Sequence, residues 1–179
     1  SSEAYSKEVF DVWKADAVTV SPYMGSYSVA PFINYCGKGK GVYVLVRTSN
    51  PGANDLQQLR TETGRKLFME TAANVIKWHK PGVGAVVGAT NIAELEKITK
   101  FFAATRKRVQ LLIPGVGAQG GSAKDVAATL KKINSDIRIH RINSSSGISY
   151  AYERYGGSDY VAAAEKAVEG LNAEIGKIA

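Results

Sequence analysis

Five short runs of apolar residues constrain the fold of this chain more than any other feature of its sequence. They cover residues 17–20, 42–46, 83–87, 109–113 and 137–142, are rich in Val and Ile, and are bounded by Gly, Pro, Ser or Asn. Runs of this length and composition predict β-strands. Because four of the five, all but 137–142, are almost uniformly apolar and do not alternate with polar residues, we expect strands that are covered on both faces, as in a parallel sheet.

Helical patterns occupy the intervals between these runs. At residues 93–102 apolar side chains recur every three or four positions after Asn91, a residue type that caps helices. Residues 125–133 and 160–178 show the same spacing. Residues 54–80 are long enough for a helix with an irregular start, and we expect a further helix before the first strand. The alternation of strand and helix, without a linker or low-complexity tract, predicts a single domain over residues 1–179.

Two architectures fit this repeated strand–helix order. An open doubly wound sheet is satisfied by the predicted strands, whereas a (β/α)8 barrel normally needs about 250 residues. Because the chain has 179 residues, the periodicity taken alone favours the open sheet.

The formal net charge of +7 is compatible with three functions: solubility, attraction of an anionic ligand, or nucleic-acid binding. Along the sequence the basic residues are scattered. The one tight run, residues 106–108, sits between a helix and a strand, where cations meet the negative end of the helix dipole. We therefore expect no nucleic-acid partner.

Composition argues against several other classes of protein. No window approaches the roughly 20 consecutive apolar residues that a membrane-spanning helix requires, and the first residues do not resemble a signal peptide. Cys36 is the only cysteine, so an intrachain disulfide or a cysteine zinc site is not possible, and we expect it in the core. His79 and His140 lie far apart without metal-ligand spacing. We expect a cytoplasmic protein with no metal site and no membrane partner.

In parallel α/β folds the ligand site lies at the carboxyl ends of the strands. All five predicted ends are polar or rich in glycine, and none supplies a carboxylate or a lysine; they are residues 21–25, 47–52, 88–91, 114–121 and 143–147. Hydroxyls, amides and glycines suit the binding of a polar anion and do not suit acid–base chemistry.

Residues 114–121 (Pro-Gly-Val-Gly-Ala-Gln-Gly-Gly) carry the clearest local signal, with four glycines before a predicted helix start near Ser122. Glycines let the backbone approach a ligand closely, and the free N–H groups at a helix start favour a phosphate. The same composition also occurs in ordinary tight turns. The segment is not a Walker motif, because no Gly-Lys-Ser/Thr follows.

Taken together, four of these segments resemble the later strands of orotidine 5′-monophosphate decarboxylases. They are residues 16–25 (DAVTVSPYMG), 44–52 (VLVRTSNPG), 84–90 (GAVVGAT) and 114–121 (PGVGAQGG). They occur in the family's order, and the Thr-Ser-Asn-Pro-Gly and closing Asn-Ser-Ser segments are similar to its longer bacterial, archaeal and protozoan branch. The resemblance covers essentially the whole chain. It implies that the chain is the C-terminal portion of a (β/α)8 barrel and supplies about five βα units. This differs from the open sheet that the periodicity alone favours.

The resemblance also implies an activity and a set of site residues. The family's enzymes are cofactor-free lyases that convert orotidine 5′-monophosphate to UMP and CO2 in pyrimidine biosynthesis, using remote binding energy to stabilise a carbanion-like transition state. Ser49 would hydrogen-bond the pyrimidine edge, Gln119 would bridge the base and the phosphate, and Pro114 would line the site. The backbone of Gly117 and Ala118 would lie near the phosphate. The implied substrate-binding set also includes Thr48, Ser145 and Ser146.

The chain departs from the family pattern in two ways. The catalytic Asp-x-Lys-x-x-Asp motif does not occur in it, and residues 1–5 resemble the stretch that follows that motif. We therefore expect the proton-donating lysine on a second segment or chain that completes the barrel, within the homodimer that the family forms. Ser146 stands where the family has a phosphate-binding arginine, whose bidentate contact a serine cannot replace.

Two alternatives remain open. One is a non-catalytic remnant or fragment of the same scaffold that binds a nucleotide phosphate, which the absent lysine and Ser146 favour. The other is a sister enzyme such as a 3-keto-hexulose-phosphate synthase, which the Thr-Ser-Asn-Pro-Gly loop argues against.

Overall fold

The computed structural model describes residues 1–117 and 119–178. Over these residues the chain forms a parallel sheet of five strands, β1 (Ala17–Val20), β2 (Gly41–Arg47), β3 (Val83–Val87), β4 (Gln110–Ile113) and β5 (Arg141–Ile142). The helices are α1 (Ser2–Lys7) with the π-helical turn η1 (Glu8–Val12), α2 (Ser26–Ile33), α3 (Ala53–Gln57), α4 (Leu67–Trp78), α5 (Ile92–Ala104), α6 (Ala123–Lys132), α7 (Ser145–Ser149), α8 (Ala151–Tyr155) and α9 (Tyr160–Gly176). Two 3-10 turns, η2 (Cys36–Lys38) and η3 (Ile137–Ile139), complete the elements.

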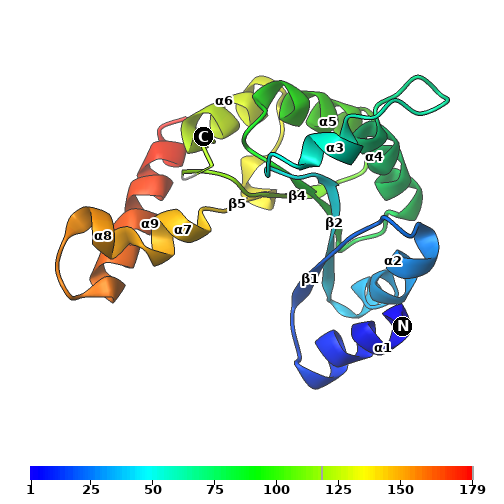
Figure 1. Cartoon of the computed structure of the whole chain (residues 1–179), viewed down its shortest axis with the longest axis horizontal. Helices are drawn as coiled ribbons and strands as arrows, with labels where there is room; N and C mark the ends of the chain where they lie inside the picture. The colour runs from blue at the N-terminus through cyan, green and yellow to red at the C-terminus, as the bar shows by residue number, and fades with distance from the viewer. Residues whose placement is uncertain (118, 179) are drawn as a thin grey trace.

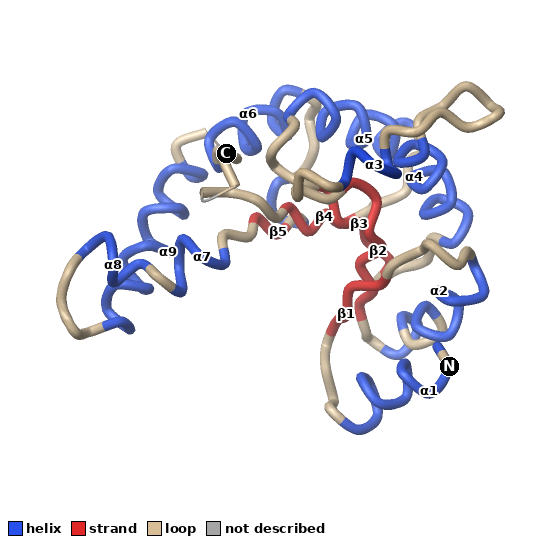
Figure 2. The backbone as a smooth tube through the Cα atoms, in the orientation of Figure 1, coloured by secondary structure: helices blue, strands red, loops and turns tan. Residues whose placement is uncertain are grey.

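The strands lie in the sheet in the same order as in the chain, β1-β2-β3-β4-β5. Because crossovers between parallel strands are right-handed, steps that all run in one direction place their helices on one face. Figures 1 and 2 show α2, α4, α5 and α6 along the convex side of a curved sheet. A doubly wound sheet reverses its strand order and carries helices on both faces, so the preference from periodicity alone is wrong. The topology is that of the (β/α)8 barrel, as the resemblance implies.

The main core lies between the convex face of the sheet and these helices. Residues paired in register share a face, so Val20, Val44, Ala85 and Leu111 form one buried row. Fully buried side chains of the covering helices, among them Leu95, Ile98 and Leu130, pack against the sheet. Cys36 belongs to this core, as predicted.

Most helix predictions are confirmed with small shifts at the ends. Asn91 caps α5, since its side-chain oxygen accepts the Glu94 N–H at 3.1 Å, and Ser122 caps α6 in the same way. Residues 54–80 contain two helices, α3 and α4, where the sequence predicts one with an irregular start. Within the described ranges no helix is both long and apolar enough to cross a membrane.

The fifth strand is shorter than the run at 137–142 predicts. Residues 137–139 form η3, and only β5 itself pairs with β4. The turn forms because the Asp136 side chain accepts the backbone N–H of Arg138 at 3.2 Å and closes a local ring that competes with strand pairing. An apolar run cannot reveal this competition.

Next to this turn, the buried ring of His140 takes the place of a strand carbonyl. Its Nδ1 accepts the Leu111 N–H at 3.0 Å, and its Nε2 lies 2.8 Å from the Ser135 hydroxyl. Burial lowers the pKa of His140 from 6.5 to about 4; the negative charge of Asp136 opposes this shift, and the positive charge of Arg141 adds to it. The ring is therefore neutral at physiological pH, with the free lone pair that the Leu111 bond requires.

This depressed pKa predicts an acid-sensitive fold. Between pH 6.5 and about 4 the unfolded chain binds a proton that the folded chain does not, so stability is full above that window and decreases as the pH falls through it. The expected loss between pH 7 and pH 5 is about 2 kcal/mol, measured by urea unfolding of the full-length protein. His140→Asn, whose side-chain oxygen can accept the Leu111 N–H without titrating, should remove most of this loss. An identical pH dependence in the two proteins would contradict the assignment.

Candidate functional site

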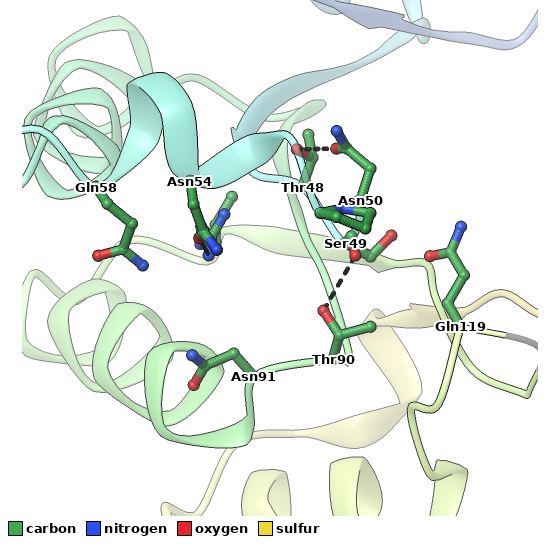
Figure 3. A pocket seen from close by; sticks show the side chains of 10 residues that line it. Thr48, Ser49, Asn50, Asn54, Gln58, Thr90, Asn91 and Gln119 are labelled. Carbon is green, nitrogen blue, oxygen red and sulfur yellow. Dashed lines mark hydrogen bonds between the residues drawn. The ribbon is translucent and has the colours of Figure 1, made fainter.

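The carboxyl ends of β2, β3 and β4 surround an open pocket of about 740 Å³. Its walls are mostly hydroxyls and amides, and Arg47 is the one ionisable side chain among the residues that line it. Figure 3 shows Ser49, Thr90 and Gln119, from three successive strand ends, close together. The lining consists of Arg47, Thr48, Ser49, Asn50, Pro51, Asn54, Gln58, Thr90, Asn91 and Gln119.

Ser49 is held in this pocket by two glycines. A Cβ on Gly88 would lie 2.9 Å from the backbone nitrogen, Cα and Cβ of Ser49. A Cβ on Gly115, whose φ is +94°, would lie 2.7 Å from Ser49 Cβ. The Thr90 hydroxyl donates to the Ser49 carbonyl at 3.3 Å. Two of the glycines at the strand ends therefore make room for Ser49 between β3 and β4.

This close packing predicts the effect of a single added methyl group. In Gly88→Ala the new Cβ meets backbone, which cannot rotate away, so Ser49 must shift. Overpacking of this kind costs about 1–3 kcal/mol of stability, because the displaced Ser49 cannot keep its packing between the two glycines. The matched control is Gly37→Ala, where a Cβ meets nothing within 4 Å. Equal urea midpoints for the two variants would contradict the packing.

Gln119 approaches Ser49 from the loop after β4. Its side-chain oxygen would lie 3.0 Å from a Cβ on Gly115, the glycine that also contacts Ser49. The two polar side chains that the sequence assigned to the pyrimidine thus line one pocket, although they are far apart in the chain. Thr48 lines the same pocket.

The loop at 114–121 folds back on itself before α6. The Gly117 N–H donates to the Gly121 carbonyl at 2.9 Å, and three of its glycines have φ between +87° and +94°. Pro114, half-buried at the start of the loop, accepts the Ala89 N–H through its carbonyl at 2.8 Å. Ala118, predicted to lie near a phosphate, falls outside the described residues.

The segment after β5 meets this loop through Ser144, which the sequence did not single out. Ser144 is buried, and its hydroxyl donates to the Val116 carbonyl at 3.0 Å. Ser145 and Ser146 begin α7 and are exposed. Ser146 lines a separate pocket of about 270 Å³ together with Arg154. The structure therefore places these two serines outside the lining of the 740 Å³ pocket.

Beneath the pocket lies a buried ion pair that sequence reasoning missed. The Arg47 Nε donates to Glu94 Oε2 at 2.6 Å, and both side chains are about nine-tenths buried. The other guanidinium nitrogens donate to Gln57 Oε1 at 3.2 Å and Asn54 Oδ1 at 2.7 Å. Gln57 Oε1 also accepts the Thr48 N–H at 2.9 Å. The ion pair is thus connected to the residue that precedes Ser49.

A β-bulge makes this ion pair possible. Leu45 pairs with Val86 and Arg47 with Val87, so Val46 and Arg47 together oppose a single residue of β3. Strict alternation would turn Val46 and Arg47 to opposite faces, whereas the bulge allows both to be buried, at 2% and 7% exposure. Two features of the sequence could have indicated this ion pair. Arg47 is a charged residue at the end of an apolar run, and Glu94 lies in the first turn of a predicted helix.

The arrangement suits binding of a polar ligand and offers no group for proton transfer among the described lining residues. The structure, where described, also contains no cluster of three or more His, Cys, Asp or Glu side chains that could hold a metal ion. His79 contacts the Arg108 carbonyl at 3.3 Å, and His140 is used within the fold.

A family model described as "Orotidine 5'-phosphate decarboxylase / HUMPS family" matches residues 2–166. Among curated relatives, the orotidine 5′-phosphate decarboxylases of Bordetella avium and Delftia acidovorans are 44% and 41% identical over 99% and 94% of this chain. The chain spans about three fifths of their length, 62% and 59% respectively.

Two solved structures show the same fold. The structure of Leishmania donovani OMP decarboxylase has a TM-score of 0.74 and 34% identity, covering 97% of this chain and 63% of its own. The structure of Leishmania donovani UMP synthase has a TM-score of 0.73 and 37% identity, covering 97% of this chain and 36% of its own.

Proposed function

The chain belongs to the orotidine 5′-phosphate decarboxylase / HUMPS family, and on that premise we propose that it supplies the substrate-binding side of an enzyme that converts orotidine 5′-monophosphate to UMP and CO2. The observation that carries the proposal is the convergence of Ser49 and Gln119 in one polar pocket. These are the two side chains that the family motifs assign to the base. The relatives named as decarboxylases, 41–44% identical, support this branch of the family over the other.

In the proposed reaction the bond between C6 and the carboxylate carbon breaks. CO2 leaves, the electron pair stays on C6, and a proton is then added to C6. The described residues contribute a fixed polar frame: Ser49 hydrogen-bonds the pyrimidine edge, Gln119 reaches the base and the phosphate, and the backbone at Gly117 lies near the phosphate. Since two glycines and the Arg47–Glu94 pair fix this frame beforehand, little reorganisation is needed in the transition state.

The proton donor belongs to the same proposal. The only ionisable side chain in the pocket lining is Arg47, which is buried and paired with Glu94. A lysine in the family's Asp-x-Lys-x-x-Asp motif, outside these 179 residues, would donate the proton, and the strands that carry it would complete the barrel. We further propose that the enzyme is a lyase that needs no cofactor, is cytoplasmic and forms a homodimer.

The test is decarboxylation of orotidine 5′-monophosphate by the full-length protein and its Ser49→Ala variant. Loss of the hydroxyl leaves a polar edge of the base without its partner, which costs about 1–3 kcal/mol. The ratio kcat/KM should therefore fall roughly 5- to 150-fold. Ser158→Ala, in an exposed loop, is the control. Unchanged kinetics in Ser49→Ala would show that the motif misplaces this residue.

One observation favours the alternative of a non-catalytic nucleotide-binding scaffold. Ser146 replaces the arginine of the family motif, and it lies apart from the pocket that contains Ser49. Release of labelled CO2 separates the two functions: UMP binding without CO2 release from a folded full-length protein would support the scaffold.

A further inference from the structure

Ten of the 23 lysines and arginines, which are scattered along the sequence, gather at one edge of the folded chain. Segments that precede the strands of a parallel sheet all lie at its amino-terminal edge, opposite the ligand site. Here these segments, together with Arg141 at the start of β5, are residues 13–16, 34–40, 77–82, 105–109 and 133–141, which we call the amino edge. They contain ten lysines and arginines but only two acidic residues, Asp16 and Asp136.

This surplus of eight positive charges at the amino edge exceeds the net charge of the whole chain, which is +7. The remaining surface is therefore close to balanced. Because the pocket with Ser49 lies at the other end of the strands, the surplus is not placed to bind a substrate there. The positive surplus at the amino edge therefore indicates a second anionic partner that binds away from the pocket.

Contacts join the amino-edge segments into one surface. Lys40 Nζ lies 3.9 Å from Asp16, and the His79 Nε2 lies 3.3 Å from the Arg108 carbonyl oxygen. Arg108 and Arg138 both contact Asp136, at 3.6 and 2.8 Å. Eight of the ten cations are exposed. A third aspartate, Asp11, accepts the Tyr35 hydroxyl at 2.6 Å. Three aspartates cannot neutralise ten cations, so this surface is open to a polyanion.

Aromatic rings lie among these cations. Both tryptophans of the chain belong to the amino edge: Trp13 is 67% exposed beside Lys14, and the half-buried Trp78 follows Lys77. The Lys38 ammonium lies 5.1 Å from the centre of the Tyr35 ring. Cations interleaved with accessible rings match a single nucleic-acid strand, whose phosphates contact the cations while unstacked bases lie on the rings. An acidic polypeptide would use the cations and leave the rings unused.

We propose that the amino edge binds single-stranded nucleic acid through its phosphates and by base stacking, independently of the nucleotide pocket. The expectation of no nucleic-acid partner rested on the scatter of basic residues along the sequence, and the fold removes that reason. Because the contacts are to phosphates and ring faces, the binding should depend strongly on salt and little on base sequence.

The test uses full-length protein and a fluorescein-labelled 20-nucleotide oligo(dT). At about 50 mM salt the anisotropy of the probe should rise, and tryptophan fluorescence should be quenched in step with it. If about five phosphates are contacted, the plot of log K against log salt should have a slope of about −3.5. UMP should not compete. No binding at this salt concentration overturns the proposal.

Two variants distinguish the effect of the amino edge on probe binding from the effect of the protein's net charge. One triple variant, Lys38→Glu/Lys77→Glu/Arg106→Glu, reverses three exposed cations from three segments of the edge. The other, Lys97→Glu/Lys124→Glu/Lys177→Glu, reverses three exposed lysines elsewhere, on α5, on α6 and directly after α9. The first should weaken binding at least about tenfold more than the second, with decarboxylase activity retained in both as a control for folding. Equal losses would show that overall charge, and not this edge, attracts the probe.

A third variant tests the rings. Trp13→Ala should weaken binding about 5- to 150-fold, the range of base–aromatic stacking, whereas Tyr160→Ala, an exposed ring on α9, should not. Poly-glutamate at equal charge concentration should compete poorly. If Trp13→Ala binds normally, or if poly-glutamate competes as well as oligo(dT), the partner is an acidic polypeptide and the nucleic-acid proposal is wrong.

Discussion

Replacement of Arg47 by alanine will destabilise the protein by about 3–5 kcal/mol, because it leaves a buried carboxylate without its ion-pair partner. Glu94 is only 8% exposed; its Oε2 accepts from Arg47 Nε at 2.6 Å, and its Oε1 accepts from the neutral Gln58 amide at 2.5 Å. The Lys66 ammonium is 3.9 Å away from Glu94 and partly exposed, so it compensates little and moves the expected loss toward the lower end of the range. The free energy of unfolding in urea measures the effect.

A double replacement makes this prediction sharper. Arg47→Met combined with Glu94→Leu removes both charges and keeps similar volume, so it should recover most of the stability that the single variant loses. The control is Glu96→Gln on the same helix, which removes exposed contacts to Lys100 and Lys132 and should change stability by less than about 1 kcal/mol. A loss from Arg47→Ala as small as that of the control would contradict the role of the buried pair.

Replacement of Ser146 by arginine will raise the affinity for UMP about 10- to 150-fold. The family motif has an arginine at this position, and a hydrogen bond to a charged group is worth roughly 1.5–3 kcal/mol. In the structure Ser146 is exposed at the start of α7 and lines a pocket of about 270 Å³, so an arginine side chain has room to extend. Isothermal titration of UMP against the full-length protein and the variant measures the gain.

Ser149→Arg is the matched control for this experiment. It adds the same charge to the same helix, but Ser149 lines a different pocket, with Ile148 and residues of α9. A specific contact to the phosphate should appear only in Ser146→Arg. Equal gains in both variants would mean long-range attraction, and no gain in either would mean that Ser146 does not face the bound nucleotide.

Most of the strands could be predicted from the sequence because each rests on a local pattern. The apolar runs at 17–20 and 83–87 coincide with β1 and β3. Every residue of β3 is buried, which explains its uniform composition, whereas in the edge strand β1 only Val20 is buried. Ser49 and Gln119 could be paired only through the family resemblance, because no pattern within one segment shows that they line a common pocket.

The remaining features depend on contacts between distant segments or on local competition. The strand predicted at 137–142 is shortened because Asp136 closes a turn and His140 accepts a bond that a backbone carbonyl would otherwise take. The Arg47–Glu94 pair depends on a bulge that shifts the alternation of side chains by one residue. The amino edge is invisible in the sequence because its cations come from five separate segments.

A crystal structure of the full-length protein with UMP bound tests the central claim most directly. We predict that the pyrimidine edge lies within hydrogen-bonding distance, about 3.5 Å or less, of the Ser49 hydroxyl and the Gln119 amide. The phosphate should lie beside the loop that contains Gly117. A nucleotide bound elsewhere, or bound in this pocket without contact to Ser49 and Gln119, would contradict the account.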